Sequence, residues 1–353
     1  MVKNQEALKN KIDLKGFLIT VLSKTKNTVF DLFKIMIPII LIIKILQEVN
    51  LLEYIVHPFN YIMQLVGLPE IYALAWLGAI FNTCYMAMTL IAVFFQENPL
   101  SVEQITVLGL MILISHSLFI EGAIVHKFKV NGFFSTFLRV ISSLIFGYLL
   151  HITSQYFGWM QERATSPFYT ETKFYSKTFL DLYNAGVLNL DFNIWFENIL
   201  LWLYSQGKTL CLITFVIFII FLIIELLKRF NVVGKIDAVF KPFFSMMRIS
   251  KKNNTVTSIC YLIGLSYGYG LLKEEKENSP FFKKDQPFKV LSFLAIAHAI
   301  IEDGLIFILL GANGWIVILG RSMWAVLVVM ILSWLILPNL SEKTKNKYLY
   351  KKN

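Results

Sequence analysis

The chain has 353 residues, of which 56% are hydrophobic and 16% are charged, and its formal net charge is +10. A water-soluble domain of this length needs more polar residues to cover its surface, so the composition excludes an ordinary soluble domain and indicates an integral membrane protein. The basic residues lie between apolar runs and at both ends, as membrane topology requires, which argues against nucleic acid as a partner.

A helix needs about 20 apolar residues to cross the bilayer core. A basic segment, residues 1–28, precedes the first apolar run, and its alternation of lysines with apolar residues predicts an amphipathic helix on the membrane surface, with a loosely ordered tail as the alternative. No small-residue cleavage site follows, so we expect no cleavable signal peptide. The clearest apolar runs are 33–49, 105–125, 133–150, 209–227, 288–310 and 315–337.

Two segments share a pattern of polar residues that is rare inside apolar runs. SHSLFIEG begins at Ser115 and AHAIIEDG begins at Ala297; each holds a histidine, an acid five positions later and then a glycine, and an arginine follows each segment. Three such matches at one offset indicate an internal repeat. The matched pairs are His116 with His298, Glu121 with Asp303, and Arg139 with Arg321 (298 − 116, 303 − 121 and 321 − 139 are each 182).

We therefore divide the chain into two repeats, residues 29–151 and 209–338. The linker between them, residues 152–208, is more polar, and its stretch 188–206 is predicted to form an interfacial amphipathic helix. Residues 339–353 form a basic tail.

Lysine and arginine gather in cytoplasmic loops, and this rule predicts the topology. The predicted sides agree only if each repeat crosses the membrane an odd number of times, so that equivalent segments face opposite sides, as in an inverted-topology repeat. We expect a multi-pass protein of the cell (inner) membrane with both termini cytoplasmic. The inside segments are 1–28, 126–130, 228–252 and 339–353, and the outside segments are 48–70, 96–103 and the linker.

The predicted fold is all-α, with about three spanning helices, one broken or re-entrant segment and an interfacial amphipathic helix in each repeat. The broken segments are 71–95 and 255–272, which small and polar residues interrupt. Matched broken segments in two halves point to a binding site, whereas two ordinary spans with packing glycines are the alternative. The interrupting residues are Gly78, Asn82 and Thr83 in the first segment, and Ser258, Gly264, Ser266, Gly268 and Gly270 in the second.

A charge at the centre of a spanning helix costs roughly 2.5–3.5 kcal/mol on insertion scales, so ionisable residues there are candidate functional residues. In one interpretation each arginine pairs with the acid of its own repeat and holds helices together. In the other, the acids and histidines bind a substrate or a coupling ion. His298 and Glu302 are four apart and share a helix face, whereas His116 and Glu121 diverge unless the helix breaks near Gly122.

The substrate- or ion-binding candidates are His116, Glu121, His298, Glu302 and Asp303, followed by Asn82, Thr83 and Ser266; Arg139 and Arg321 are candidates for structural or charge-pairing roles. Histidine and carboxylate groups also suit metals, but no dense ligand spacing predicts a metal site.

The order of motifs resembles the nucleoside recognition, or Gate, domain of bacterial integral membrane proteins. A proline-bearing first span is followed by HPF at 57–59 or KPF at 241–243, then by LGAIFNTC or LIGLSYGYG, and then by the histidine–acid–glycine segments. The resemblance covers both repeats. Gate-like segments also occur in concentrative nucleoside transporters, in the membrane part of ferrous iron transporters and in spore maturation proteins, so the resemblance implies several different functions.

We expect a secondary transporter, or a transporter-like permease, for a small polar solute such as a nucleoside or a related metabolite, with its site between the repeats near the bilayer midplane. Divalent metal ion transport and a non-transporting structural or regulatory membrane protein are the alternatives. No phosphate loop, HExxH or nucleophile elbow is present in the sequence, so we expect no enzyme activity and no cofactor. The expected partners are the lipid bilayer, a small-molecule or ion substrate, and either further copies of the chain or another membrane protein.

Overall fold

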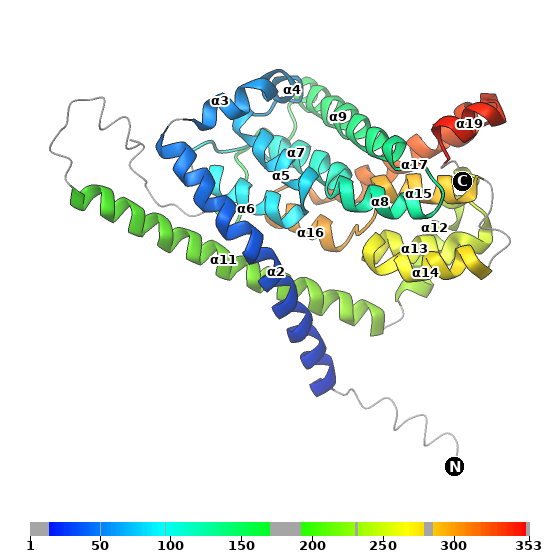
Figure 1. The fold of residues 1–353 in the computed structure, drawn as a ribbon, viewed down its shortest axis with the longest axis horizontal. Coiled ribbons are helices and arrows are strands. Elements are labelled where there is room, and N and C mark those ends of the chain that lie inside the picture. Colours follow the sequence, from blue (N-terminus) through cyan, green and yellow to red (C-terminus); the bar gives the residue numbers. More distant parts are fainter. Residues whose placement is uncertain are drawn as a thin grey trace, which may run out of the picture.

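The computed structural model describes residues 14–49, 51–95, 97–169, 192–229, 232–278 and 285–350. Every named element in these ranges is a helix, as expected (Figure 1). The helices are α2 (Leu14–Glu48), α3 (Leu52–Val56), α4 (Asn60–Leu65), α5 (Ala73–Phe81), α6 (Cys84–Phe94), α7 (Val102–Ser115), α8 (Leu118–Lys127), α9 (Gly132–Phe157), α11 (Phe192–Arg229), α12 (Val232–Met246), α13 (Asn254–Ile263), α14 (Leu265–Asn278), α15 (Gln286–Ile296), α16 (Glu302–Leu309), α17 (Arg321–Ile331), α18 (Leu337–Asn339) and α19 (Glu342–Tyr348), with short 3₁₀ and π segments between some of them.

Four helical stretches among the described residues are long and apolar enough to cross a membrane. They coincide with four of the six apolar runs, whereas run 288–310 is divided between α15 and α16 and run 33–49 lies within α2. A pair of helices bent by 103°, Tyr54–Leu65 with Glu70–Phe81, adds a fifth if it is one broken span. The four stretches are Val102–Lys127, Gly132–Phe157, Ile199–Ile223 and Ile316–Asn339.

The two longest helices, α2 and α11, cross each other on one side of the molecule (Figure 1). Lys24 pairs with Glu225 at 2.8 Å, and the Lys44 ammonium lies 6.0 Å from the centre of the Trp202 ring, so the helices run in opposite directions. The sequence predicts a surface helix separate from the first span and an interfacial helix separate from run 209–227. Instead each pair is one continuous helix, because no residue at either junction interrupts the backbone hydrogen bonds of the helix. Residues 1–13 and 188–191 lie outside the described ranges.

Both segments predicted to be broken are broken. Helices α5 and α6 separate at Asn82 and Thr83, and α13 and α14 separate at Gly264, whose φ of +110° favours glycine. In each pair the second helix turns back along the first: a Cβ added at Gly268 would lie 2.0 Å from the Cys260 sulfur. Each helix has at most 14 residues, too short to cross a bilayer core alone.

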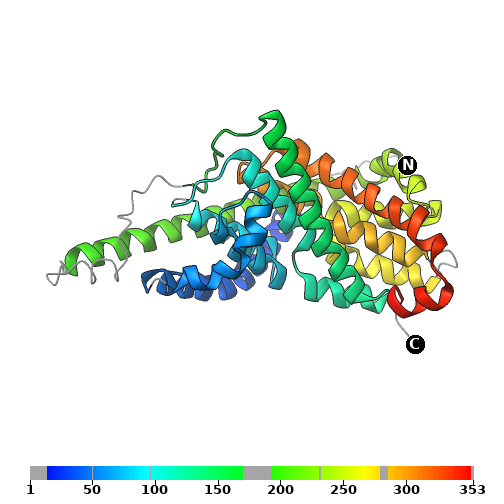
Figure 2. The ribbon, with the colours of Figure 1, turned by 90° about the horizontal axis from the view of Figure 1, so that it is seen from above.

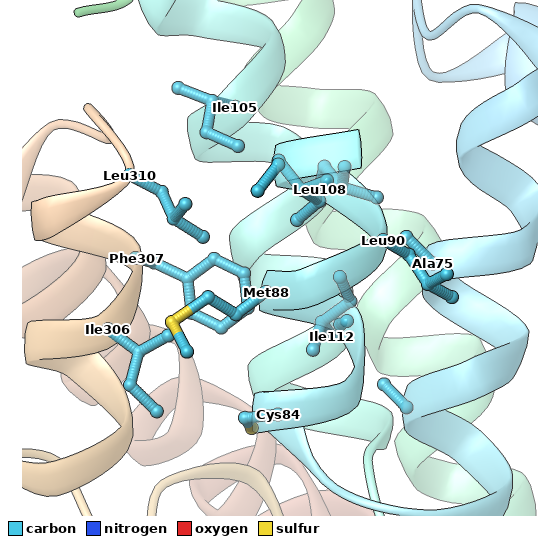
Figure 3. Packing of buried hydrophobic residues seen from close by; sticks show 14 of the residues in the cluster. Ala75, Cys84, Met88, Leu90, Ile105, Leu108, Ile112, Ile306, Phe307 and Leu310 are labelled. Carbon is cyan, nitrogen blue, oxygen red and sulfur yellow. The ribbon is translucent and has the colours of Figure 1, made fainter. Parts of the chain in front are cut away.

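The described residues form two apolar cores: one includes residues of α6, α7 and α16, and the other includes residues of α12, α13, α15 and α17. Figure 3 shows Phe307 of α16 facing α7, with Met88 of α6 beside it. Gly109 makes this approach close, since a Cβ added there would lie 2.8 Å from Cδ1 of Phe307. Packing at this density resists added volume.

Contacts between loops define two ends of the helical body. At one end Asn131 binds the backbone of α19 and of Leu349, so part of the predicted basic tail is a docked helix (Figure 2). Tyr350 there donates a hydrogen bond to Asp285, and burial together with that carboxylate raises the pKa of Tyr350. We call this the tail end.

At the opposite end, the amides of Val102 and Glu103 donate to the carbonyls of Glu162 and Met160, at 2.9 and 2.8 Å. The Asn313 amide donates to the Thr106 hydroxyl at 2.8 Å. We call this the linker end. Helix α9 therefore starts at the tail end and finishes at the linker end, whereas Ile316–Asn339 runs in the opposite direction.

Replacing Gly109 with alanine should destabilise the protein by about 1–3 kcal/mol, because the added methyl meets the Phe307 ring. Thermal unfolding in detergent measures the loss. The control is Gly207→Ala on α11, where an added Cβ has nothing within 4 Å. Equal melting temperatures for the two variants would contradict the packing argument.

Candidate functional site

The centre of the molecule holds two helix breaks. Helix α7 ends at Ser115 and α8 begins at Leu118, and Ser117 between them has a φ of +50°. Helix α15 ends at Ile296 and α16 begins at Glu302, and Ala299 between them has a φ of +48°. Ser117 and Ala299 are again 182 positions apart (299 − 117). A left-handed backbone at a residue other than glycine is strained, and the surrounding contacts must hold it.

From the sequence, His116 and Glu121 diverge unless the helix breaks near Gly122; in the structure the helix breaks earlier, between Ser115 and Leu118. Gly122 lies inside α8, where its carbonyl would be 2.6 Å from a Cβ added at Gly132. Gly132 is therefore the glycine that the close approach of α8 and α9 requires, and Gly122 marks no bend.

Each break leaves carbonyl groups at a helix end, and a buried arginine binds them. Nε of Arg139 donates to the carbonyl of Ile114 at 2.6 Å, and Nη2 donates to that of His116 at 2.7 Å. In the other half, Nε of Arg321 donates to the carbonyl of Ile296 at 2.8 Å. Both arginines therefore satisfy backbone groups that water cannot reach.

The two arginines differ in their third contact. Arg139 pairs with Glu121 at 2.7 Å, so one arginine does bind the acid of its own half. Arg321 instead donates through Nη2 to the carbonyl of Leu113 in the first half, at 2.7 Å, and its Nη1 has no hydrogen-bond partner within the described chain. No ion pair between Arg321 and Asp303 is present among these residues, although the charge of Arg321 acts on Asp303.

The two histidines meet, and each reaches the acid of the opposite half. Nε2 of His116 and Nε2 of His298 are 3.3 Å apart. Nε2 of His298 is 2.9 Å from Oε1 of Glu121, and Nε2 of His116 is 3.5 Å from Oδ2 of Asp303. All four residues are buried, with at most 8% of each residue exposed. The structure thus gathers four of the five leading candidates into one buried cluster, which we call the central cluster.

Glu302, the fifth leading candidate, lies at the edge of the central cluster. The Tyr85 hydroxyl donates to its Oε1 at 3.2 Å. The prediction that His298 and Glu302 share a helix face is wrong. Residues 297–301 are not α-helical, so a spacing of four residues does not place these two side chains on one face. Sequence reasoning missed Tyr85, whose only signal was its place just after a predicted break.

Of the remaining candidates, Asn82 and Thr83 form the turn between α5 and α6. Ser117 binds this turn twice: its amide donates to the carbonyl of Ala79 at 2.8 Å, and its hydroxyl donates to that of Asn82. The Thr83 hydroxyl is buried with no partner among the residues described. Cys84, which the sequence analysis did not select, has its sulfur within 4.8 Å of ligand atoms of His116 and Asp303. Ser266 lies on α14, but its side chain is outside the described residues.

Replacing Arg139 with glutamine should cost about 3–5 kcal/mol, because it leaves the Glu121 carboxylate buried and unpaired. Glu121→Gln in the same background should recover part of that loss, so the double variant should be more stable than the sum of the single losses predicts. Thermal unfolding of the four proteins in detergent measures this coupling. Strict additivity would show that the pair contributes no coupling.

Comparison with curated proteins gives a distant relative. The uncharacterized membrane protein YvoD of Bacillus subtilis (strain 168) is 23% identical over 329 residues, which cover 91% of this chain and 95% of that protein. No family model matches the chain, and no solved structure matches it. The chain is thus a multi-pass membrane protein distantly related to YvoD, in contact with a lipid bilayer.

Proposed function

We propose that the chain consists of two inverted-topology repeats of the Gate type. Helix α9 and the equivalent stretch Ile316–Asn339 run in opposite directions, as do α2 and α11. Equivalent residues also touch each other: the Trp324 indole donates to the Ser142 hydroxyl 182 positions earlier, at 2.7 Å, as His298 meets His116. Such contacts are expected where a pseudo-two-fold axis passes between two halves.

Small local details recur at the same spacing and support this proposal. The Asn131 side chain accepts from the amides of residues 133 and 134, and the Asn313 side chain accepts from those of residues 315 and 316. Gln104 donates to the carbonyl of Gly67, and Gln286, 182 positions later, donates to that of Arg248, 181 positions after Gly67. These contacts lie at opposite ends of the helical body.

On this basis the protein is a secondary transporter whose site lies between the two repeats. The main observation that supports this proposal is the central cluster. A buried ion pair is often no more stabilising than apolar side chains of the same volume, so stability alone gives no reason to keep four ionisable groups at the junction of two halves. Ionisable groups at membrane depth mark substrate or ion sites.

The substrate class that follows from the Gate-like motifs is a small polar solute such as a nucleoside or a related metabolite. The central cluster offers acceptors on Glu121 and Asp303, and Nη1 of Arg321 beside it has no hydrogen-bond partner among the described residues; these groups suit a ligand with several hydrogen-bonding groups. A non-transporting Gate-fold protein is the other candidate, because Arg139 holds the first break closed through three hydrogen bonds.

Uptake into proteoliposomes separates these two functions. We expect time-dependent uptake of a radiolabelled nucleoside by the wild-type protein and at least about a tenfold lower rate for Glu121→Gln, because the variant removes a charge from the proposed site. His126→Gln, at an exposed position on α8, is the matched control and should keep the wild-type rate. No uptake, together with no stabilisation by nucleosides or organic anions in a thermal-shift screen, would favour the non-transporting protein.

The tail end is rich in lysine and arginine, so we place it and both termini in the cytoplasm. Single cysteines at the exposed positions 97 and 251, in a background with the exposed Cys211 replaced by serine, should react with a membrane-impermeant maleimide from opposite sides. Position 97 should react in intact cells and position 251 only after permeabilisation. Labelling of both positions from one side would rule out the inverted arrangement.

A further inference from the structure

The hydrogen bonds of the two central histidines determine where their protons sit. Nδ1 of His116 lies 3.3 and 3.2 Å from the carbonyl oxygens of Ile112 and Leu113, and Nδ1 of His298 lies 2.7 Å from that of Leu294. A carbonyl oxygen only accepts hydrogen bonds, so each Nδ1 carries a hydrogen. In a neutral imidazole the other nitrogen, Nε2, then presents a lone pair.

Three acceptor atoms consequently converge on one point. The two Nε2 atoms are 3.3 Å apart, and Oε1 of Glu121 lies 2.9 Å from Nε2 of His298 and 3.5 Å from Nε2 of His116. The second oxygen of Glu121 is bound by Arg139, which fixes the carboxylate. Lone pairs that face each other in a buried site repel unless a cation lies between them.

The spacing of these atoms fits a metal ion. A tetrahedral zinc site with bonds of about 2.0–2.1 Å separates neighbouring ligand atoms by about 3.3–3.4 Å. The observed separations of 3.3, 2.9 and 3.5 Å lie around that value. Two histidines with one carboxylate form a known zinc ligand set, and a fourth position is left open.

The surrounding groups have the form of an outer coordination shell. Metal-bound histidines usually donate their second ring N–H to a carbonyl, and metal-bound carboxylates are themselves hydrogen-bonded. Both histidines and Glu121 meet these conditions through Leu113, Leu294 and Arg139. The sequence shows no dense ligand spacing because the two histidines lie 182 positions apart. Arg139 occupies Oε2 of Glu121 and leaves Oε1 free for an ion.

We propose that His116, His298 and Glu121 form a binding site for a divalent transition-metal ion of the zinc class, with one ligand-bearing segment from each half. Asp303, whose Oδ2 lies 3.5 Å from Nε2 of His116, stands beside the open fourth position. The inference rests on the proposed function only in taking this ion to be what the transporter moves or couples to.

Metal titration of the purified protein tests the site directly. The protein is prepared in detergent with an affinity tag that contains no histidine, is stripped with a chelator, and is titrated with Co²⁺ and then Zn²⁺. We expect one Co²⁺ per chain with the visible absorption of a tetrahedral ion, displaced by Zn²⁺ and not by Mg²⁺, which prefers oxygen ligands. A thiolate charge-transfer band would instead place the ion at Cys84, His116 and Asp303, the alternative cluster, and overturn the proposed ligand set.

Variants assign the ligands. His298→Gln and Glu121→Gln should each weaken Co²⁺ binding by at least about 100-fold, since loss of an outer-shell partner alone typically costs 10–100-fold. His126→Gln is the matched control and should bind as the wild type does. Melting curves show which variants are folded. Wild-type protein that melts cooperatively and binds no Co²⁺ or Zn²⁺, or binding that survives both His116→Gln and His298→Gln, would overturn the site.

The metal-site proposal and the transporter proposal can be contradicted separately. Stoichiometric metal binding without uptake of any solute or ion would support the metal site and contradict the transporter proposal. Nucleoside uptake by protein that binds no metal would do the reverse.

Discussion

A helix that breaks in the interior of a membrane protein exposes carbonyl groups that water cannot reach, and this constraint governs the centre of the molecule. Unpaired backbone groups in such a place cost several kcal/mol each. The two breaks, after α7 and after α15, are closed by Arg139 and Arg321, whose side chains reach the carbonyls of Ile114 and Ile296. The guanidinium group is suited to this work because it presents five donors in a fixed plane.

A buried guanidinium then requires a counter-charge, which the two acids of the central cluster supply; this need does not account for the two histidines. Glu121 balances Arg139 directly, and Asp303 lies where the charge of Arg321 acts on it. Each acid is in turn approached by the histidine of the other half. In each half the helix break, the arginine, the acid and the histidine are thus linked in one network. These residue types, which are rare inside apolar runs, therefore occur together in the sequence and recur at an offset of 182.

The network is not the same in the two halves. Arg139 directs all its described bonds to its own half, whereas Arg321 donates to Leu113 across the junction and keeps one nitrogen without a partner among the described residues. The same motif therefore has two different bonding states within one structure. The tight contact of Phe307 with Gly109 joins the halves in the apolar core beside this junction.

The sequence by itself determined the membrane class, the four long apolar stretches and the polar residues that match at an offset of 182. The length of an apolar run, and polar residues of a type rare inside such runs, can be recognised in a single sequence. It also indicated both broken segments, through Asn82 and Gly264. It did not locate the first central break, since the left-handed backbone of Ser117 carries no residue signal. It also divided α2 and α11 where their helices continue.

Only the tertiary structure decided which groups meet. The partners of His298 are His116 and Glu121, from the other half, and not Glu302 four positions on. Cys84 lies beside the central cluster, and Tyr85 beside Glu302 at its edge, because the α5–α6 turn is bound to Ser117. Helical spacing describes neighbours along one helix, whereas a site built where two broken helices face each other depends on distances through space that no periodicity in the chain encodes.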